Sequence, residues 1–261
     1  MRAEDIVAAL DLPDAASVGQ RVPKRLLIES GAPTAADKRR INEGIEEIVW
    51  LAALKPTTIG VPEYRDATRE YLEISVLRMA LHAQAKPTRL VELVHRAIPY
   101  PVLLVTVQAD AAAISAAHKR WSEGEMGKTV LDGEVFTATA DGLSPDLSRE
   151  FSCTLAVGRQ PRASLLTVYQ GWIDLLVACH AARITGRLVL PASSAEADAR
   201  RAALCEYKRL ETEACRVRAL AEGEAQMPRQ VERNLELKRL ETEMQHLRGK
   251  LSLFVEEEIK G

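Results

Sequence analysis

The sequence is poor in aromatic residues and has almost no net charge. Phe, Trp and Tyr make up 4% of the 261 residues, which argues against a surface that stacks the bases of single-stranded nucleic acid. The 35 basic and 37 acidic residues nearly cancel, so the chain as a whole is not a polycation. Binding to nucleic acid would therefore depend on a local group of basic side chains.

Motifs of nucleotide-binding, hydrolytic and metal sites are missing as well. The chain has no Gly-x-x-x-x-Gly-Lys-Ser/Thr loop, no GxGxxG and no Gly-x-Ser-x-Gly. Its four cysteines include no CxxC pair, and its histidines have neither HxH nor HxxxH spacing. We therefore expect no cofactor and no metal, and we interpret the cysteines as small buried thiols.

Neither secretion nor membrane insertion is predicted. Glu4 and Asp5 lie where a signal peptide needs a basic start. The most apolar window, 163–182, has about the length of a membrane span but contains Asp174, and a charge near the bilayer centre costs about 3 kcal/mol. We expect a cytoplasmic protein with no membrane partner, in which a long buried helix covers about 162–183.

The first two thirds of the chain predict an α+β domain. Thr34 and Asp37 form an acidic capping box, and apolar residues from Ile41 to Leu54 recur at helical spacing, which predicts one helix ending near Lys55. Further along, the patterns predict strands at 57–61, 71–81, 101–107 and 111–117, a helix at 89–98, a surface loop at 118–139 with one short strand at 130–136, and a helix from Ser144-Pro145 to about Val157.

A repeated segment dominates the C-terminal part. Glu206-Tyr-Lys-Arg-Leu-Glu-Thr-Glu213 returns as Glu236-Leu-Lys-Arg-Leu-Glu-Thr-Glu243. Each copy lies in a 3-4 spaced apolar seam, the pattern of a coiled coil. Gly223 and Pro228 between the copies favour a helix end and a new helix start. The seam residues are Ala203, Tyr207, Leu210, Ala214, Val217 and Ala221 in the first copy, and Leu237, Leu240, Met244, Leu247, Leu251 and Phe254 in the second.

These patterns define the expected fold class. We predict an α+β protein with a mostly antiparallel sheet and helices on one side, then a helical bundle segment and a C-terminal antiparallel coiled-coil hairpin. The expected domains are 1–192 and 193–261. Because three of six positions in the first seam are alanine, we expect the hairpin to pack on itself only partly and to bind a protein partner or a second copy through the second seam. The alternative is a hairpin that lies wholly against its own globular domain.

An acidic group near the first predicted strands is the only candidate for catalysis. Two carboxylates that hold Mg²⁺ and a lysine two residues after one of them would indicate a metal-dependent nuclease. That lysine is missing from Glu73-Ile-Ser75. The alternative is that these carboxylates are solvated charges or helix caps. The candidate residues are Glu47, Glu63, Asp66 and Glu73.

Basic residues near the N-terminus, and a basic triplet farther on, are candidates for contact with DNA phosphates. Isolated basic side chains in loops and first turns are more often simply solvated. The candidates are Arg21, Lys24, Arg25, Lys38, Arg39 and Arg40, together with His118, Lys119 and Arg120.

Several separated blocks of the sequence resemble a bacterial domain family of unknown function. The blocks are Gln20–Leu27, Ile41–Glu47, Trp50–Pro62, Tyr71–Ile74, Pro99–Val102, Ala117–Arg120 and Val231–Lys238. Members of that family lie beside superfamily-2 helicases and site-specific DNA methyltransferases in genome-defence neighbourhoods. The resemblance implies an accessory protein associated with restriction or phage defence, and it supplies no catalytic residues.

Three functions therefore stay open. The favoured hypothesis is a non-enzymatic accessory or scaffold subunit that assembles with a helicase or a DNA methyltransferase, with a homo-oligomer through the hairpin as a further option. A divergent metal-dependent nuclease and a DNA-binding module are the alternatives.

Overall fold

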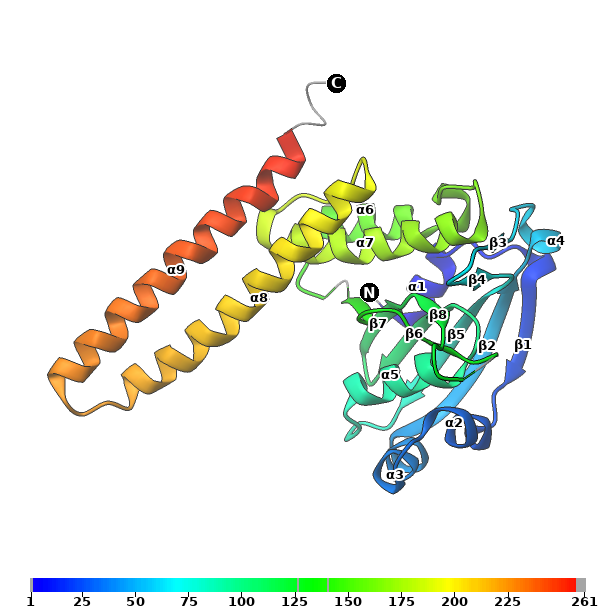
Figure 1. Cartoon of the computed structure of the whole chain (residues 1–261), viewed down its shortest axis with the longest axis horizontal. Coiled ribbons are helices and arrows are strands. Elements are labelled where there is room, and N and C mark those ends of the chain that lie inside the picture. Colours follow the sequence, from blue (N-terminus) through cyan, green and yellow to red (C-terminus); the bar gives the residue numbers. More distant parts are fainter. Residues whose placement is uncertain (1, 126, 140, 257–261) are drawn as a thin grey trace. The chain divides into compact units, whose positions relative to one another are not determined.

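The computed structural model of this chain describes residues 2–125, 127–139 and 141–256 (Figure 1). The chain divides into two units, Met1–Cys179 and His180–Gly261. The domain boundary expected at 192/193 stays a prediction; Ser193 is the N-cap of helix α8.

The first unit is built on a six-stranded sheet in the order β1-β2-β5-β6-β7-β10. Every neighbouring pair is antiparallel except β5 and β6, which are parallel and are joined by helix α5. The mostly antiparallel α+β fold expected from the sequence is therefore confirmed. The strands are β1 Ser17–Arg21, β2 Ile45–Leu54, β5 Ile74–Leu81, β6 Val102–Gln108, β7 Ala111–Ala116 and β10 Phe136–Thr139; β3 Tyr64–Arg65 pairs with β4 Glu70–Tyr71, and β8 Lys119–Trp121 with β9 Thr129–Leu131.

Helices cover both faces of this sheet rather than one (Figure 1). On one face, Leu27, Ile41 and Leu93 pack against Leu77 and Leu104 in a single buried cluster. On the other face lie α1, α6 and the first part of α7. Two-sided cover is required because five consecutive residues of β6, from Val102 to Thr106, are buried. The helices are α1 Ala3–Ala9, α2 Lys24–Gly31, α3 Ala35–Gly44, α4 Pro56–Ile59, α5 Pro87–Ala97, α6 Pro145–Leu155 and α7 Leu165–Thr185, with 3-10 turns at Asp14–Ala16 and Val157–Arg159.

The helix expected to reach Lys55 ends at Gly44, and the residues after it form β2. Thr34 caps this helix as expected, since its hydroxyl accepts from the Asp37 amide. The error has a physical cause. Irregularities between Ile45 and Glu47 and between Trp50 and Ala52 shift the register of β2 against β5. Each irregularity interrupts the alternation of buried and exposed residues that identifies a strand, and the remaining spacing imitates a helix.

The strand expected at 57–61 is also wrong, because Pro56–Ile59 forms one helical turn. Pro56 occupies the first position, where a missing N–H costs nothing. The hydroxyl of Thr58 accepts from the Lys55 amide, and Gly60 ends the turn with a positive φ of 64°. These local turn interactions thus outweigh the strand preference of the β-branched residues Thr57, Thr58 and Ile59.

In the predicted loop at 118–139, residues 118–125 and 127–139 contain three strands rather than one. Lys119–Trp121 and Thr129–Leu131 form a two-stranded ribbon, and Phe136–Thr139 extends the main sheet beside β7. The short strand expected at 130–136 overlaps only the ends of two of these. By contrast, the strands expected at 101–107 and 111–117, and the helices expected at 89–98 and from Ser144, are confirmed within a few residues.

Helix α7 confirms the long buried helix expected at about 162–183. It is long and apolar enough to span a bilayer by length and composition, and 72% of its most apolar window is buried inside the structure. Its Tyr169 hydroxyl donates to the Val102 carbonyl at 2.7 Å and accepts from the Ala117 amide at 2.9 Å. These bonds tie the helix to the ends of β6 and β7.

The second unit contains a helical hairpin of α8 Ser194–Glu222 and α9 Met227–Glu256. The Ser193 hydroxyl caps α8 by accepting from the Glu196 amide, and Gly223 ends it. Pro228 lies in the first turn of α9. The two helices pack along each other, so the antiparallel hairpin predicted from the repeat is confirmed.

A buried polar group joins helix α5 to β7 and β8. His95 is fully buried, and its Nε2 lies 3.0 Å from the Ser115 hydroxyl. The Lys119 ammonium donates to the carbonyl oxygens of His95 and Ile98 at the end of α5, where the helix dipole favours a cation. Burial lowers the pKa of His95 to about 3, with a smaller contribution from Lys119, and lowers the pKa of Lys119 to about 7.

Replacing His95 with Gln should reduce the acid sensitivity of the fold. The pKa of His95 is lower in the folded state than the usual value near 6.5, so between about pH 6.5 and 3 the unfolded chain binds a proton that the folded chain does not. Stability from this group is complete above pH 6.5 and falls by at most about 1.4 kcal/mol per pH unit below it. Urea titrations at pH 5, 6 and 7 should show a shallower loss in His95→Gln than in the wild type. An equal loss, or the same change in the exposed control His246→Gln, would contradict this.

Candidate functional site

The four carboxylates proposed for metal binding do not gather in one place. Glu47 lies opposite Ala80, whereas Glu73 directly precedes Ile74, which lies opposite Leu54. Seven strand residues at about 3.3 Å each place Glu47 and Glu73 roughly 20 Å apart. One metal ion cannot bind both.

Each of these carboxylates already has protein partners. Glu73 is nearly buried and is paired with Lys55 at 3.0 Å and with the Ser75 hydroxyl at 3.1 Å. Asp66 accepts from the amides of Thr68 and Arg69 in the β3–β4 turn, and hydrogen bonds from Thr68 hold its pKa well below the usual range. Glu47 is paired with Arg21 at 3.6 Å and with Arg78 at 3.9 Å, and Glu63 with Arg65 at 3.4 Å. Within residues 2–125, 127–139 and 141–256, no group of three His, Cys, Asp or Glu could hold a metal ion.

The N-terminal basic residues lie on β1, α2 and α3, and the two helices pack together. Most of their charges are shared with carboxylates at short range: Arg21 with Glu47, Arg25 with Glu29 at 2.6 Å, Arg39 with Glu43 at 2.8 Å, and Arg40 with Asp37 at 3.1 Å. Lys24 donates to the Asn42 carbonyl at 3.1 Å, and Lys38 is exposed. Pairing lowers the local positive potential, and DNA contact by this set stays a prediction.

The basic triplet is more deeply embedded than its sequence implies. Lys119 is buried at the end of α5. Arg120 is half-buried and paired with Glu123 at 3.0 Å. His118 lies between the Tyr71 hydroxyl, 2.5 Å from Nδ1, and Gln170 Oε1, 2.8 Å from Nε2. This contact between residues 47 and 52 positions apart has no local sequence signal, and it links the first strands to α7.

One hollow of the first unit is mainly apolar. It has a volume of about 360 Å³, and its walls include Trp50, Leu77 and Ile98. Leu26 and Tyr100 border it and are both exposed, and among the described residues that line it Arg21 alone has a charged side chain. The predicted basic set therefore adjoins an apolar surface, which is atypical of a surface that binds phosphates alone.

The two seams of the hairpin differ in burial. Leu210, Ala214, Val217 and Ala221 of α8 are all buried. In α9, Leu251 is buried, whereas Leu237, Leu240, Met244 and Leu247 are only half-buried; the side chain of Phe254 lies outside the described part of the chain. The large side chains of α9 cover the smaller ones of α8 and stay partly accessible themselves. The predicted partner-binding set thus lies largely in the seam within the hairpin.

A second apolar feature of α9 lies outside the seam. Met227, Val231 and Leu235 are 72%, 53% and 57% exposed, and Leu220 of α8 is 43% exposed. The three α9 residues recur every four positions, so they share one face of the helix. We call Met227, Val231 and Leu235 the outer stripe. The sequence signal for this stripe is a set of large apolar residues that recur every four positions outside the seam.

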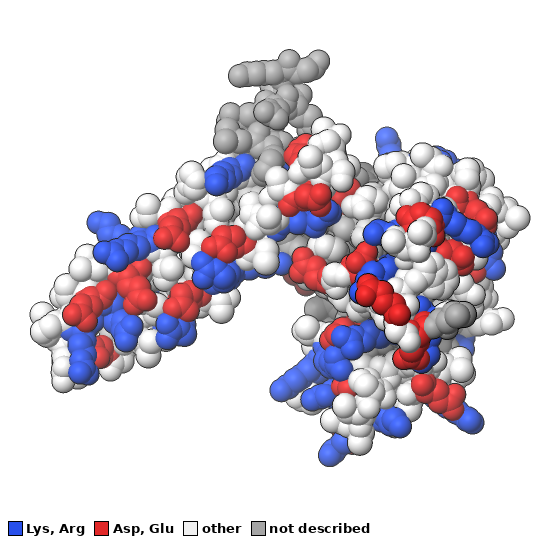
Figure 2. Space-filling view, in the orientation of Figure 1, with Lys and Arg blue, Asp and Glu red and all other residues white. Residues whose placement is uncertain are grey.

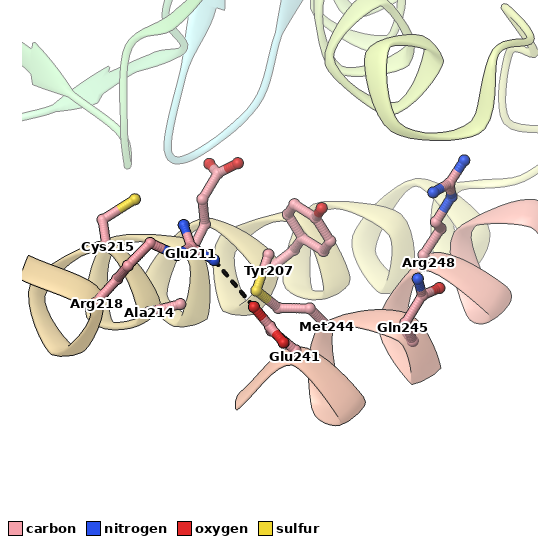
Figure 3. A pocket seen from close by; sticks show the side chains of 9 residues that line it. All are labelled: Tyr207, Glu211, Ala214, Cys215, Arg218, Glu241, Met244, Gln245 and Arg248. Carbon is pink, nitrogen blue, oxygen red and sulfur yellow. Dashed lines mark hydrogen bonds and ion pairs between the residues drawn. The ribbon is translucent and has the colours of Figure 1, made fainter. Parts of the chain in front are cut away.

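Between the helices lies a groove with a volume of about 380 Å³ (Figure 3). Arg218 of α8 and Glu241 of α9 form an ion pair of 2.9 Å across it. The groove is lined by Tyr207, Glu211, Ala214, Cys215 and Arg218 of α8 and by Glu241, Met244, Gln245 and Arg248 of α9. Basic and acidic side chains are interspersed over the face of the hairpin that Figure 2 shows.

Replacing Leu210 with Ala should destabilise the hairpin strongly. Leu210 is 2% exposed, and removing a buried leucine side chain costs about 2–5 kcal/mol. The matched control is Leu235→Ala, because Leu235 is exposed in the outer stripe and should change stability by less than about 0.5 kcal/mol. Thermal unfolding followed by circular dichroism compares the two. Equal effects would show that the seam does not contribute the stability assigned to it.

Comparison with known proteins identifies one family. A family model described as "Domain of unknown function (DUF4391)" matches residues 10–244, which include both the sheet and most of the hairpin. The comparison with curated proteins gave no match. The comparison with solved structures gave none either.

Proposed function

This chain belongs to the DUF4391 family of domains of unknown function, and from that premise we propose that it is a non-enzymatic accessory or scaffold subunit whose α8–α9 hairpin binds a partner protein. The observation that supports this most directly is the outer stripe. Its three large side chains are more than half exposed and extend along about 12 Å of helix.

An apolar stripe on an otherwise charged helix favours a protein as the binding partner. Amphipathic helices dock one apolar face into grooves of other proteins, and contiguous exposed apolar surface marks interaction sites. Interspersed charges argue against nucleic acid, since duplex DNA attracts surfaces with an excess of Lys and Arg. Arg209 with Glu206 and Arg216 with Glu213 illustrate this balance on α8.

The dispersed carboxylates support a role without catalysis. Glu47 and Glu73 belong to opposite ends of one strand pair, and each is neutralised by Arg or Lys. The proposed partner is a superfamily-2 helicase or a DNA methyltransferase of a bacterial restriction or phage-defence complex. The resemblance of the sequence to a family found beside such enzymes supports that choice.

The double substitution Val231→Glu and Leu235→Glu should abolish partner binding. Two carboxylates in the outer stripe would have to be desolvated on binding, which is strongly unfavourable. The tagged full-length chain, expressed in its native host, should co-purify a helicase or methyltransferase, and the double variant should lose at least nine tenths of it.

The control is Thr242→Glu with His246→Glu, which adds the same charge at exposed positions of α9 outside the stripe. It should retain the partner. Helix content measured by circular dichroism should be equal in all three proteins. Recovery of no such enzyme by the wild type, or equal recovery by the stripe variant, would refute the proposal.

A further inference from the structure

The groove between α8 and α9 is lined by matching positions of the two repeat copies. Glu211 and Glu241 occupy the same place in the repeat, thirty residues apart, and so do Arg218 and Arg248. Ala214 and Met244, and Cys215 and Gln245, are the other matched pairs that line the groove. The hairpin therefore brings two copies of one surface together.

Antiparallel packing gives this surface a local two-fold symmetry. The Arg218–Glu241 ion pair aligns the helices at one end of the groove. Seven residues back along α8 is Glu211, and seven residues forward along α9 is Arg248. Both steps lead about 10 Å in the same direction along the hairpin, so Glu211 on α8 and Arg248 on α9 both lie toward the other end of the groove. The local axis passes between Ala214 and Met244.

The four charges consequently form a checkerboard. Arg218 and Arg248 occupy one diagonal of the groove, and Glu211 and Glu241 occupy the other. Arg218 and Glu241 are about half exposed in their ion pair. Glu211 and Arg248 are exposed and form no ion pair within the described part of the chain.

We propose that this groove binds the same groove of a second copy of the chain, so that the two hairpins form a four-helix bundle. The second copy is related to the first by a two-fold rotation about an axis in the plane of the groove, directed either along or across the helices. This rotation places the Arg diagonal of one copy over the Glu diagonal of the other. Every Arg then faces a Glu of the other copy, and every Glu faces an Arg. Four opposite-charge contacts result from one two-fold operation, as an isologous interface requires.

The groove floor favours the same occupant. Tyr207 and Met244 are half-buried and Ala214 is buried, so a second hairpin would cover their remaining apolar surface. Electrostatic complementarity adds orientation and selectivity to that apolar contact. A partner with charge of one sign would meet two repulsive corners in this groove, whereas a second copy meets none.

This inference deepens the proposed function, since it names a second copy as the occupant of one face of the same hairpin. It concerns residues other than Met227, Val231 and Leu235, so the two proposals are tested by different variants.

Charge reversal provides the test. The wild type should sediment as a dimer at micromolar concentration. Arg218→Glu with Arg248→Glu makes the groove wholly acidic, and Glu211→Arg with Glu241→Arg makes it wholly basic. Each variant alone should dimerise on the order of a hundredfold more weakly, because all four facing contacts become repulsive. An equimolar mixture of the two should form a heterodimer with wild-type affinity.

The matched control reverses Lys208 and Lys238, which occupy equivalent repeat positions outside the groove and are exposed. Lys208→Glu with Lys238→Glu should remain dimeric, as should Val231→Glu with Leu235→Glu. The heterodimer in the mixture shows that both groove variants fold. A monomeric wild type would overturn the inference, and so would dimers of either groove variant alone or a mixture that stays monomeric.

Discussion

The structure of the second unit depends on one interaction, the antiparallel packing of two copies of the same helical segment. Val217 and Leu210 are buried in the seam, and Arg218 pairs with Glu241 across it. Because the copies run in opposite directions, equivalent residues are related by a local two-fold axis. This relation turns a simple sequence repeat into a surface whose charges are complementary to themselves.

The first unit depends on a different constraint, the burial of β6 on both faces. A strand such as Val102–Gln108 needs helices above and below it. Apolar packing joins those helices to the sheet, and polar side chains add to it: Tyr169 binds the ends of β6 and β7, and Lys119 caps α5. Two residues of the basic triplet, His118 and Lys119, therefore connect the strands to helices α7 and α5.

The two units differ in the surface that they expose. Charged groups of the first unit are mostly paired at short range, as the carboxylates Glu73 and Asp37 illustrate. Many hairpin charges are paired as well, for example Arg209 with Glu206, but the hairpin also exposes the three large apolar side chains of the outer stripe. Exposed apolar surface marks sites where other proteins bind. Both proposed binding surfaces therefore lie on the hairpin.

Local signals in the sequence determined the helix caps and the hairpin. Thr34, Ser144, Ser193 and Gly223 act within one turn of the chain, so neighbouring residues suffice to predict them. Only the tertiary structure decided that 45–54 is a strand, because its bulges form against β5, and that 136–139 joins the sheet beside β7. The scattering of the carboxylates and the charge pattern of the groove were decided in the same way. Both depend on which distant segments lie side by side, and the spacing of residues along one segment contains no information about its partner.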